Sequence, residues 1–236
     1  MEIIIKNQTK DIAIEVAKHI IEIVEQNPKS VLGLATGSTP LDIYRNISKL
    51  ASVLKVSFAN VTTFNLDEYL GPVAVEQSYR YFMHENFFKF LDVDLINTKF
   101  PNEELLEKYD DEIDKAGGID IQLLGIGSNG HIAFNEPFTP FDSKTHIVKL
   151  DDKTRNDNAR FFSNIDEVPT HAITMGISTI MKAKEIILVI LGDSKVSALK
   201  QLLCLEPDES FPASVLSKHP NIKVYTTMDL FKKAFC

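Results

Sequence analysis

The chain has 236 residues, 44% of them hydrophobic, which suits one compact domain with a substantial core. Its net charge is −8 and it has no basic cluster, which argues against a nucleic-acid partner. Two cysteines without a CxxC spacing disfavour a structural disulfide or a zinc site. Because no signal peptide and no apolar run near the ~18 residues of a membrane span is evident, we expect a cytoplasmic protein with no membrane contact.

Short apolar runs alternate with amphipathic segments in the first half of the chain. Apolar positions spaced by three or four residues predict a helix that Thr9 caps and that ends near Pro28. We expect further helices over residues 40–50, 79–90 and 103–115. The apolar runs between them predict strands at residues 2–5, 31–34, 61–65 and 119–126.

The second half begins with a less regular stretch. Residues 149–169 are polar, with the pair Phe161-Phe162 as an apolar anchor, and we interpret them as a mobile lid over a site. Beyond them we expect strands at residues 185–191 and 222–226, and helices near 177–181, over 195–203 and from Met228 onward.

This alternation predicts an α/β fold in three layers, a doubly wound and mostly parallel sheet with helices on both faces. We expect residues 1–236 to form a single domain. Ligands of such folds lie beyond the carboxyl ends of the strands. Four loops follow predicted strands at that edge, and they are residues 35–39, 66–71, 127–136 and 192–195.

The first of these loops joins a strand to a helix and ends in Pro40, which suits the first helical position, after Thr39 as the cap. Free N–H groups of the helix end, together with Thr36, Gly37, Ser38 and Thr39, suit a phosphate. The loop lacks the GxxxxGK[ST] spacing of a Walker motif. A helix that is simply well capped is an equally good interpretation.

Two cations are candidates for the same phosphate. Lys195 opens a helix after a very apolar strand, and Arg160 lies in the predicted lid. Lysine would add a point charge, whereas arginine would grip phosphate with two parallel donors. The alternatives are a solvated lysine and a surface salt bridge.

Two acids, Asp67 and Glu68, follow the strand at residues 61–65. They suit a catalytic base with its neighbour, metal ligands or helix-cap acids. A carboxylate that takes a proton from carbon works best when it is shielded from water. Asp67, between Leu66 and Tyr69, is the candidate for that role.

The loop at residues 127–136 carries His131, Glu136 and Asn129. A histidine oriented by a carboxylate is a proton shuttle, but a spacing of five brings these two together only if the segment is irregular. A core histidine beside a surface glutamate is the alternative, and for Asn129 a left-handed turn. No HExxH motif is present and no further His or Cys lies near, so we expect no metal site. We also expect no cofactor.

Several segments together resemble the glucosamine-6-phosphate deaminases, within the glucosamine/galactosamine-6-phosphate isomerase family. The resemblance covers nearly the whole chain and is carried by LGLATGSTP (32–40), TTFNLDEYLG (62–71), SYRYFMHENFF (78–88), LLGIGSNGHIAFNEP (123–137) and TRNDNARFF (154–162). It implies a ribose-5-phosphate isomerase-like sheet and the conversion of glucosamine 6-phosphate and water to fructose 6-phosphate and ammonia, within amino-sugar catabolism.

The resemblance also implies residue roles. His131 would move the anomeric proton to the ring oxygen, with Glu136 orienting it, and Asp67 would remove the C2 proton of the opened sugar. The position of Asn129 is aspartate in some members, so here we expect it to position rather than to transfer protons. The phosphate would lie on the loop at residues 36–39, Arg160 and Lys195.

Longer members bind an N-acetylated sugar phosphate at a subunit interface, through a longer tail and basic residues after the Glu-Pro pair. This chain has Phe138 to Phe141 there, so we expect no such activation. Monomer and homo-oligomer both stay open. The rival interpretations are a 6-phosphogluconolactonase, which has no evident need for Asp67, and a sugar-phosphate sensor without catalysis, which would need neither Asp67 nor His131.

Overall fold

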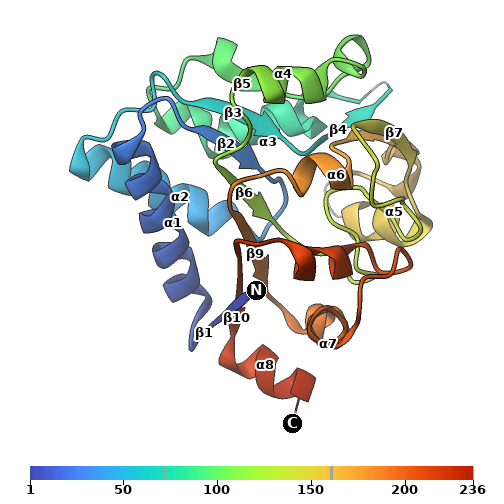
Figure 1. Ribbon diagram of the computed structural model, residues 1–236. Coiled ribbons are helices and arrows are strands. Elements are labelled where there is room, and N and C mark those ends of the chain that lie inside the picture. The colour runs from blue at the N-terminus through green and yellow to red at the C-terminus, as the bar shows by residue number, and fades with distance from the viewer. Residues whose placement is uncertain (72, 160–161, 236) are drawn as a thin grey trace.

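A parallel sheet forms the centre of the computed structural model, which describes residues 1–71, 73–159 and 162–235 (Figure 1). Within these residues seven strands pair in parallel, in the spatial order β1-β10-β9-β6-β2-β3-β5. Their bounds are β1 Glu2–Lys6, β2 Val31–Leu34, β3 Thr62–Asn65, β5 Thr98–Lys99, β6 Ile121–Leu124, β9 Ile186–Ile190 and β10 Ile222–Thr227.

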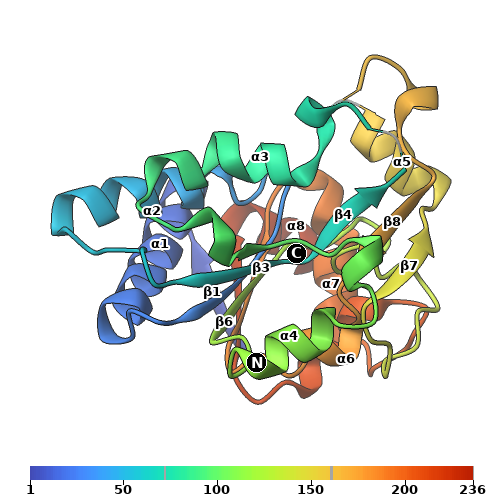
Figure 2. The ribbon, with the colours of Figure 1, turned by 90° about the horizontal axis from the view of Figure 1, so that it is seen from above.

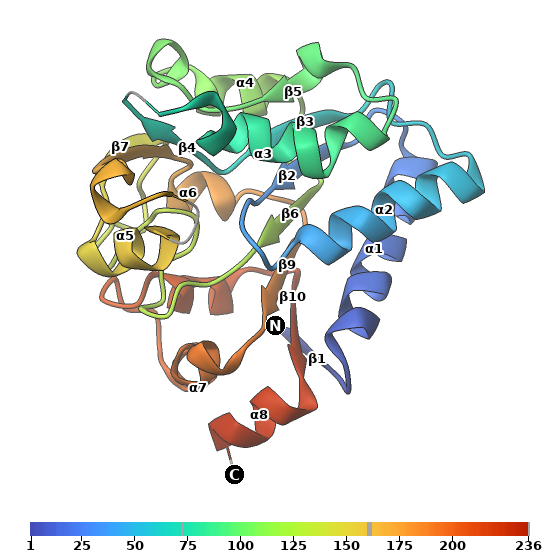
Figure 3. The same cartoon turned by 180° about the vertical axis from the view of Figure 1, so that it is seen from behind.

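Helices cover both faces of this sheet. One apolar core lies between the sheet and the first three helices, where α1 and α2 pack side by side (Figure 3). These are α1 Thr9–Gln26, α2 Leu41–Leu54 and α3 Tyr79–Asn86. The second core lies against the opposite face. Its helices are α4 Tyr109–Lys115, α6 Ile177–Ile180, α7 Val196–Cys204 and α8 Met228–Phe235.

The strand β9 illustrates why such a sheet forms from these residues. All five of its residues are buried. Because successive side chains of a strand point to opposite faces, Ile187 and Val189 enter one core, while Ile186, Leu188 and Ile190 enter the other. A continuous apolar run therefore identifies a strand buried on both sides. The predicted three-layer, mostly parallel α/β class is confirmed.

A second, antiparallel sheet stands beside the central one, as the view from above shows (Figure 2). It consists of β4 Asp67–Leu70, β8 His171–Thr174 and β7 His146–Lys149, with β8 in the middle. The short helix α5, Asp152–Asn158, follows β7. Buried aromatic side chains on this part of the fold, Tyr69 and Phe134, form a small third core. Asp67 and Tyr69 of β4 also line a cavity of the molecule.

Several sequence predictions about local structure are wrong in detail. Residues 66–71 are not a loop, because four of them form β4. The helix predicted at residues 103–115 is split into a 3₁₀ turn, Glu103–Leu105, and α4. The helix caps are Gln8 and Pro40 rather than Thr9 and Thr39, and neither makes a side-chain cap hydrogen bond.

The segment predicted as a lid is more ordered in its backbone than a polar loop suggests. Its first part forms α5, and a 3₁₀ turn, Ile165–Glu167, follows. Leu150, Thr154 and Val168 within it are buried. Arg160 and Phe161 lie outside the described residues, and the lid's movement and the single domain stay predictions.

Glu68 of β4 joins this strand to the start of α3 by accepting hydrogen bonds from backbone N–H groups. Its carboxylate accepts the N–H of Tyr69 and, at the start of α3, those of Tyr79 and Arg80, at 2.9 to 3.0 Å. Burial raises the pKa of Glu68, although these three donors act to lower it. Of the two acids in the Asp-Glu pair, Glu68 is therefore the one that caps a helix, which leaves Asp67 for another task.

Glu68→Ala is expected to lower the free energy of unfolding by roughly 2–4 kcal/mol, because it leaves three backbone donors without their charged acceptor. Urea denaturation monitored by circular dichroism measures the change. Glu107→Ala, which replaces an exposed glutamate, serves as the matched control. Equal stability of the two variants would contradict a structural role for Glu68.

Candidate active site

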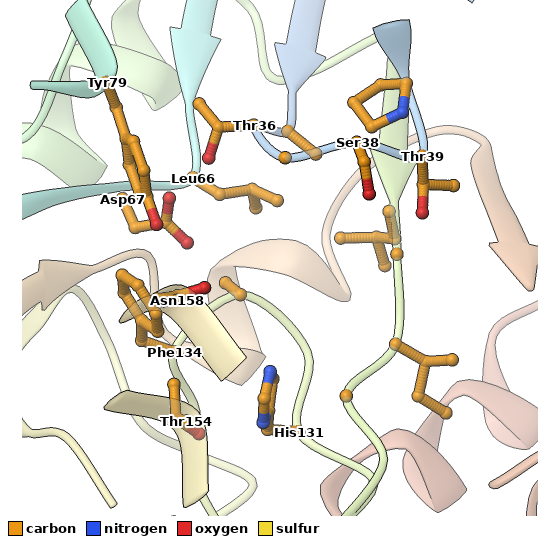
Figure 4. Close-up of a pocket in the computed structure, with 18 of the residues that line it drawn as sticks. Thr36, Ser38, Thr39, Leu66, Asp67, Tyr79, His131, Phe134, Thr154 and Asn158 are labelled. Carbon is orange, nitrogen blue, oxygen red and sulfur yellow. The ribbon is translucent and has the colours of Figure 1, made fainter. Parts of the chain in front are cut away.

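A cavity of about 600 Å³ opens at the carboxyl ends of β2, β3, β6 and β9. All four loops predicted to hold a ligand contribute to its lining. Figure 4 shows three groups of side chains around this space, with Asp67 on one side, His131 on another, and the hydroxyl groups of Ser38 and Thr39 on a third. A ligand in the cavity would meet all three groups at once.

The loop after β2 is shaped for an anion. Gly37 has a φ of 97°, a conformation that favours glycine, and it allows the turn that leads into α2. Thr36, Ser38 and Thr39 line the cavity beside the amino end of this 14-residue helix. Hydroxyl donors and the positive end of a helix dipole both suit phosphate.

The buried aromatic side chain of Tyr44 holds the start of this loop in place. The hydroxyl group of Tyr44 donates a 2.6 Å hydrogen bond to the carbonyl oxygen of Ala35. The ring of Tyr44 stacks on Phe87 with 4.4 Å between centroids. The first residue of the loop is thus tied to α2, whose Tyr44 packs on Phe87 at the end of α3.

Lys195 lies at the far side of the same edge. Gly192, with a φ of 89°, turns the chain after β9, and Lys195 caps α7 and lines the cavity. The predicted partner in phosphate binding, Arg160, lies outside the described residues. Of the predicted phosphate-binding residues, Thr36, Gly37, Ser38, Thr39 and Lys195 all line the one cavity.

Asp67, the first residue of β4, lines the cavity although only 6% of its surface is exposed. Within the described residues its carboxyl group has no ion-pair or hydrogen-bond partner. Its surroundings include Leu66, Tyr69 and Tyr79. Burial, and secondarily the charge of Glu68, raise the pKa of Asp67 to about 8.

Two tyrosines, Tyr69 and Tyr79, connect the side of the cavity that carries Asp67 to the loop after β2 and to α5. The hydroxyl group of Tyr79 donates to that of Tyr69 over 3.2 Å, and their rings lie 4.7 Å apart. Tyr79 also has a polar contact with Thr36, and Tyr69 has one with Asn158 of α5. These contacts form a chain from the anion-binding loop to the helix in the predicted lid.

His131 and Glu136 do meet, because the segment between them is irregular. The Nδ1 atom of His131 lies 3.6 Å from Oε2 of Glu136. The amide of Asn129 donates to the same oxygen at 2.9 Å, and its Oδ1 accepts the N–H of His131 at 3.3 Å. Asn129 therefore contacts both members of the pair, with a side chain that cannot itself transfer a proton at neutral pH.

Glycine is required where this segment bends around the histidine. A Cβ atom at Gly127 would lie 2.3 Å from the imidazole ring of His131, so a larger residue would displace the ring. Gly130 has a φ of 87°, and the left-handed conformation suggested for Asn129 belongs to this neighbour instead. Ala133, with a φ of 52°, adds a further bend before Glu136.

The carboxyl group of Glu136 stays ionised even well below neutral pH. Although burial alone would raise the pKa of Glu136, the nearby His131, with contributions from Thr154 and Asn129, lowers it to about 2. The N–H of Asp151, the N-cap residue of α5, also points to Glu136 Oε1 at 3.4 Å. A fixed negative charge beside the imidazole of His131 orients the ring.

Sequence reasoning missed several residues of the cavity. Tyr79, Phe134, Thr154 and Asn158 line it, yet none lies directly after a strand of the central sheet, the position that identified the others. Thr154 is only 3% exposed and belongs to the buried part of the cavity wall. All four residues lie in segments that match the family motifs, and this match was the one sequence signal that could have identified them.

The residues that the structure describes give no support for a metal site, a membrane-spanning helix or a disulfide. Among them no three His, Cys, Asp or Glu side chains gather closely enough to hold a metal ion. None of the helices in this part of the chain combines the length and the apolar character needed to cross a membrane. Cys204 is exposed and not in a disulfide, and Cys236 lies outside the described residues.

An open parallel sheet with a cavity at the carboxyl ends of its strands, lined by a buried carboxyl group and a histidine–carboxylate pair, is typical of α/β enzymes. The family model for glucosamine-6-phosphate isomerases and 6-phosphogluconolactonases matches residues 6–225. The chain belongs to this family, and the resemblance noted in its motifs is confirmed.

Relatives and solved structures support the same assignment. A glucosamine-6-phosphate deaminase of Oceanobacillus iheyensis is 50% identical over 215 residues, covering 88% of this chain and 86% of the relative. One of Shouchella clausii is 48% identical over 231 residues, covering 95% and 94%. The structure of a monomeric glucosamine-6-phosphate deaminase, 40% identical, superposes with a TM-score of 0.96 over 99% of this chain and 100% of that one.

A 6-phosphogluconolactonase from Thermotoga maritima matches with a TM-score of 0.75 at 20% identity, over 96% of this chain and 98% of that one. Identity this low shows a shared fold alone. The lactonases and this chain therefore have the same architecture, and the choice between their activities depends on the side chains of the site.

Asp67→Asn is expected to stabilise the folded chain, and more so at higher pH. Because the pKa of Asp67 rises from 3.8 unfolded to about 8 folded, only the folded state keeps the proton between these values. Stability is therefore lost as the pH rises through that window, by up to about 1.4 kcal/mol per unit, and asparagine avoids the loss. Thermal melts at pH 5 and pH 8 measure it, and an advantage that does not grow with pH would contradict the prediction.

Proposed function

We propose that this chain is a glucosamine-6-phosphate deaminase, which converts glucosamine 6-phosphate and water to fructose 6-phosphate and ammonia. The observation that carries the proposal is the shared cavity, where Asp67 and His131 face one space that the anion-binding loop closes on a third side. Relatives 44–50% identical over most of the chain bear this name. A sugar phosphate of this size suits a cavity of about 600 Å³.

Ring opening is assigned to His131. The imidazole would take the proton of the anomeric hydroxyl and return it to the ring oxygen, as the bond between C1 and that oxygen breaks. Glu136, 3.6 Å away, supports the charged imidazole. Asn129 holds Glu136 through its 2.9 Å hydrogen bond and so acts as a positioning residue.

The carbon chemistry is assigned to Asp67. In the opened sugar the C1 carbonyl acidifies the C2 proton, and Asp67 as general base would remove it to give an enolamine. Protonation at C1 and loss of ammonia from C2 then yield the ketose. Burial suits this base, because a carboxyl group with a pKa of about 8 is a stronger acceptor than one in water.

The phosphate group is assigned to residues 36–39, Lys195 and Arg160. Support comes from the loop geometry and from the position of Lys195 on the cavity wall; for Arg160 it comes from the sequence motif alone. These contacts change little during the reaction and serve to anchor the sugar. Sugar phosphates are the only partners in this proposal, with a cytoplasmic setting and without metal, cofactor, nucleic acid or membrane.

Asp67→Asn is expected to reduce ammonia release from glucosamine 6-phosphate by at least ~10²-fold, because an amide cannot accept the C2 proton. A coupled ammonia assay measures it, with Asp111→Asn, an exposed aspartate of α4, as the matched control. Unchanged turnover would remove Asp67 from the mechanism. Hydrolysis of 6-phosphogluconolactone without ammonia release by the wild-type chain would favour the lactonase instead.

Lys195→Ala is expected to raise KM more than it lowers kcat, because a phosphate contact is present in both the ground state and the transition state. Steady-state kinetics with glucosamine 6-phosphate separate the two constants. Lys200→Ala, an exposed lysine on the same helix, is the control. A fall in kcat at constant KM would exclude Lys195 as a phosphate anchor.

A further inference from the structure

The two reactive groups of the cavity are independent of each other. Asp67 enters from the start of β4, whereas His131 enters from the loop after β6, and Figure 4 shows them on different sides of the space. No hydrogen bond or ion pair joins the two side chains directly within the described part of the chain. Each can therefore act on its own part of a ligand.

The histidine side is complete without any contribution from the C2 substituent of a sugar. Glu136 is held by Asn129 at 2.9 Å, lies 3.6 Å from His131 and is ionised with a pKa of about 2. Opening a pyranose ring needs proton transfer only between the anomeric hydroxyl and the ring oxygen. Nothing in this step distinguishes an amino sugar from a neutral one.

The aspartate side, by contrast, lacks a positive charge. Asp67 is 94% buried, and no described cation pairs with it, while Glu68 next to it is a second acid. A carboxyl group in such surroundings keeps its proton unless a ligand brings a counter-charge. The ammonium group at C2 of an amino sugar supplies that charge at the carbon where the base must act. A hydroxyl or acetamido group at C2 does not.

The groups assigned to the phosphate act on the opposite end of the ligand. Ser38 and Thr39 lie across the cavity from Asp67 (Figure 4), and Lys195 also lines it, so these groups would bind any hexose 6-phosphate alike. A neutral aldohexose 6-phosphate would therefore be anchored and reach His131, but would leave Asp67 protonated.

We propose that this site has a second activity, the interconversion of the α and β anomers of neutral aldohexose 6-phosphates such as glucose 6-phosphate, with C2 unchanged. The inference rests on the proposed function for the binding mode of the sugar. His131 takes the proton from the anomeric oxygen and delivers it to the ring oxygen, the C1–O5 bond breaks, and the aldehyde forms. Rotation about C1–C2 and the reverse transfer close the ring on the other face of C1, so no atom or electron is gained or lost.

The test measures anomer exchange of glucose 6-phosphate by two-dimensional proton exchange NMR in the presence of the wild-type chain. We expect exchange at least about tenfold above the spontaneous rate, since a positioned acid–base group contributes more than that. In D₂O no deuterium should enter C2, and no fructose 6-phosphate should appear.

Three variants assign the activity within the cavity. Asp67→Asn should keep anomer exchange and lose ammonia release from glucosamine 6-phosphate, whereas His131→Gln should lose both. Glu136→Gln provides a second test of the histidine side, and thermal melts verify that each variant is folded. His171→Gln, an exposed histidine of β8, is the matched control and should retain both activities.

The outcomes separate this inference from the proposed function. Ammonia release without accelerated anomer exchange would overturn the inference and leave the deaminase standing. Anomer exchange without any ammonia release would overturn the proposed deaminase function and leave this inference standing. Rapid formation of fructose 6-phosphate from glucose 6-phosphate would overturn the idea that Asp67 needs the ammonium group, and loss of exchange in Asp67→Asn would remove the independence of the two sides.

Discussion

The rest of the site depends on the contacts that the buried carboxylate of Glu136 makes. It accepts a hydrogen bond from Asn129, lies beside the ring of His131, and receives the N–H of Asp151 where α5 begins. One side chain thus joins the loop after β6 to the start of α5. A charge buried this far is tolerated only with such partners, so it also dictates where they must be.

The cavity holds a second acid whose surroundings have the opposite effect. Donors and a histidine keep Glu136 ionised, with a pKa of about 2, whereas apolar walls and a neighbouring acid keep Asp67 protonated to a pKa of about 8. Two carboxyl groups in one site thereby gain different chemistry from environment alone. Glu68, whose oxygens are occupied by backbone donors, is excluded from that chemistry.

The fold class and the four segments that line the cavity could be predicted from the sequence, although one of them, residues 66–71, is a strand rather than a loop. Strands such as β9 are apolar on both faces, and ligands bind at the carboxyl ends of such strands. The second sheet could not, since β4 and β7 are four-residue strands with polar and charged residues, which periodicity does not distinguish from a loop. The approach of His131 to Glu136 was equally hidden, because it depends on backbone bends at Gly130 and Ala133 rather than on spacing. Thr154 and Tyr79 reach the cavity through tertiary packing alone.

The hydroxyl group of Tyr44 has a consequence for binding as well as for architecture. Its hydrogen bond to Ala35 and its stacking on Phe87 fix the start of the loop at residues 35–39 to the core of the molecule. Under the proposed function, a phosphate would meet a loop whose first residue is already held in place, so little conformational entropy would be lost on association. Tight capture of the charged end of a sugar is then compatible with a ring and a C2 centre that are free to change shape during turnover.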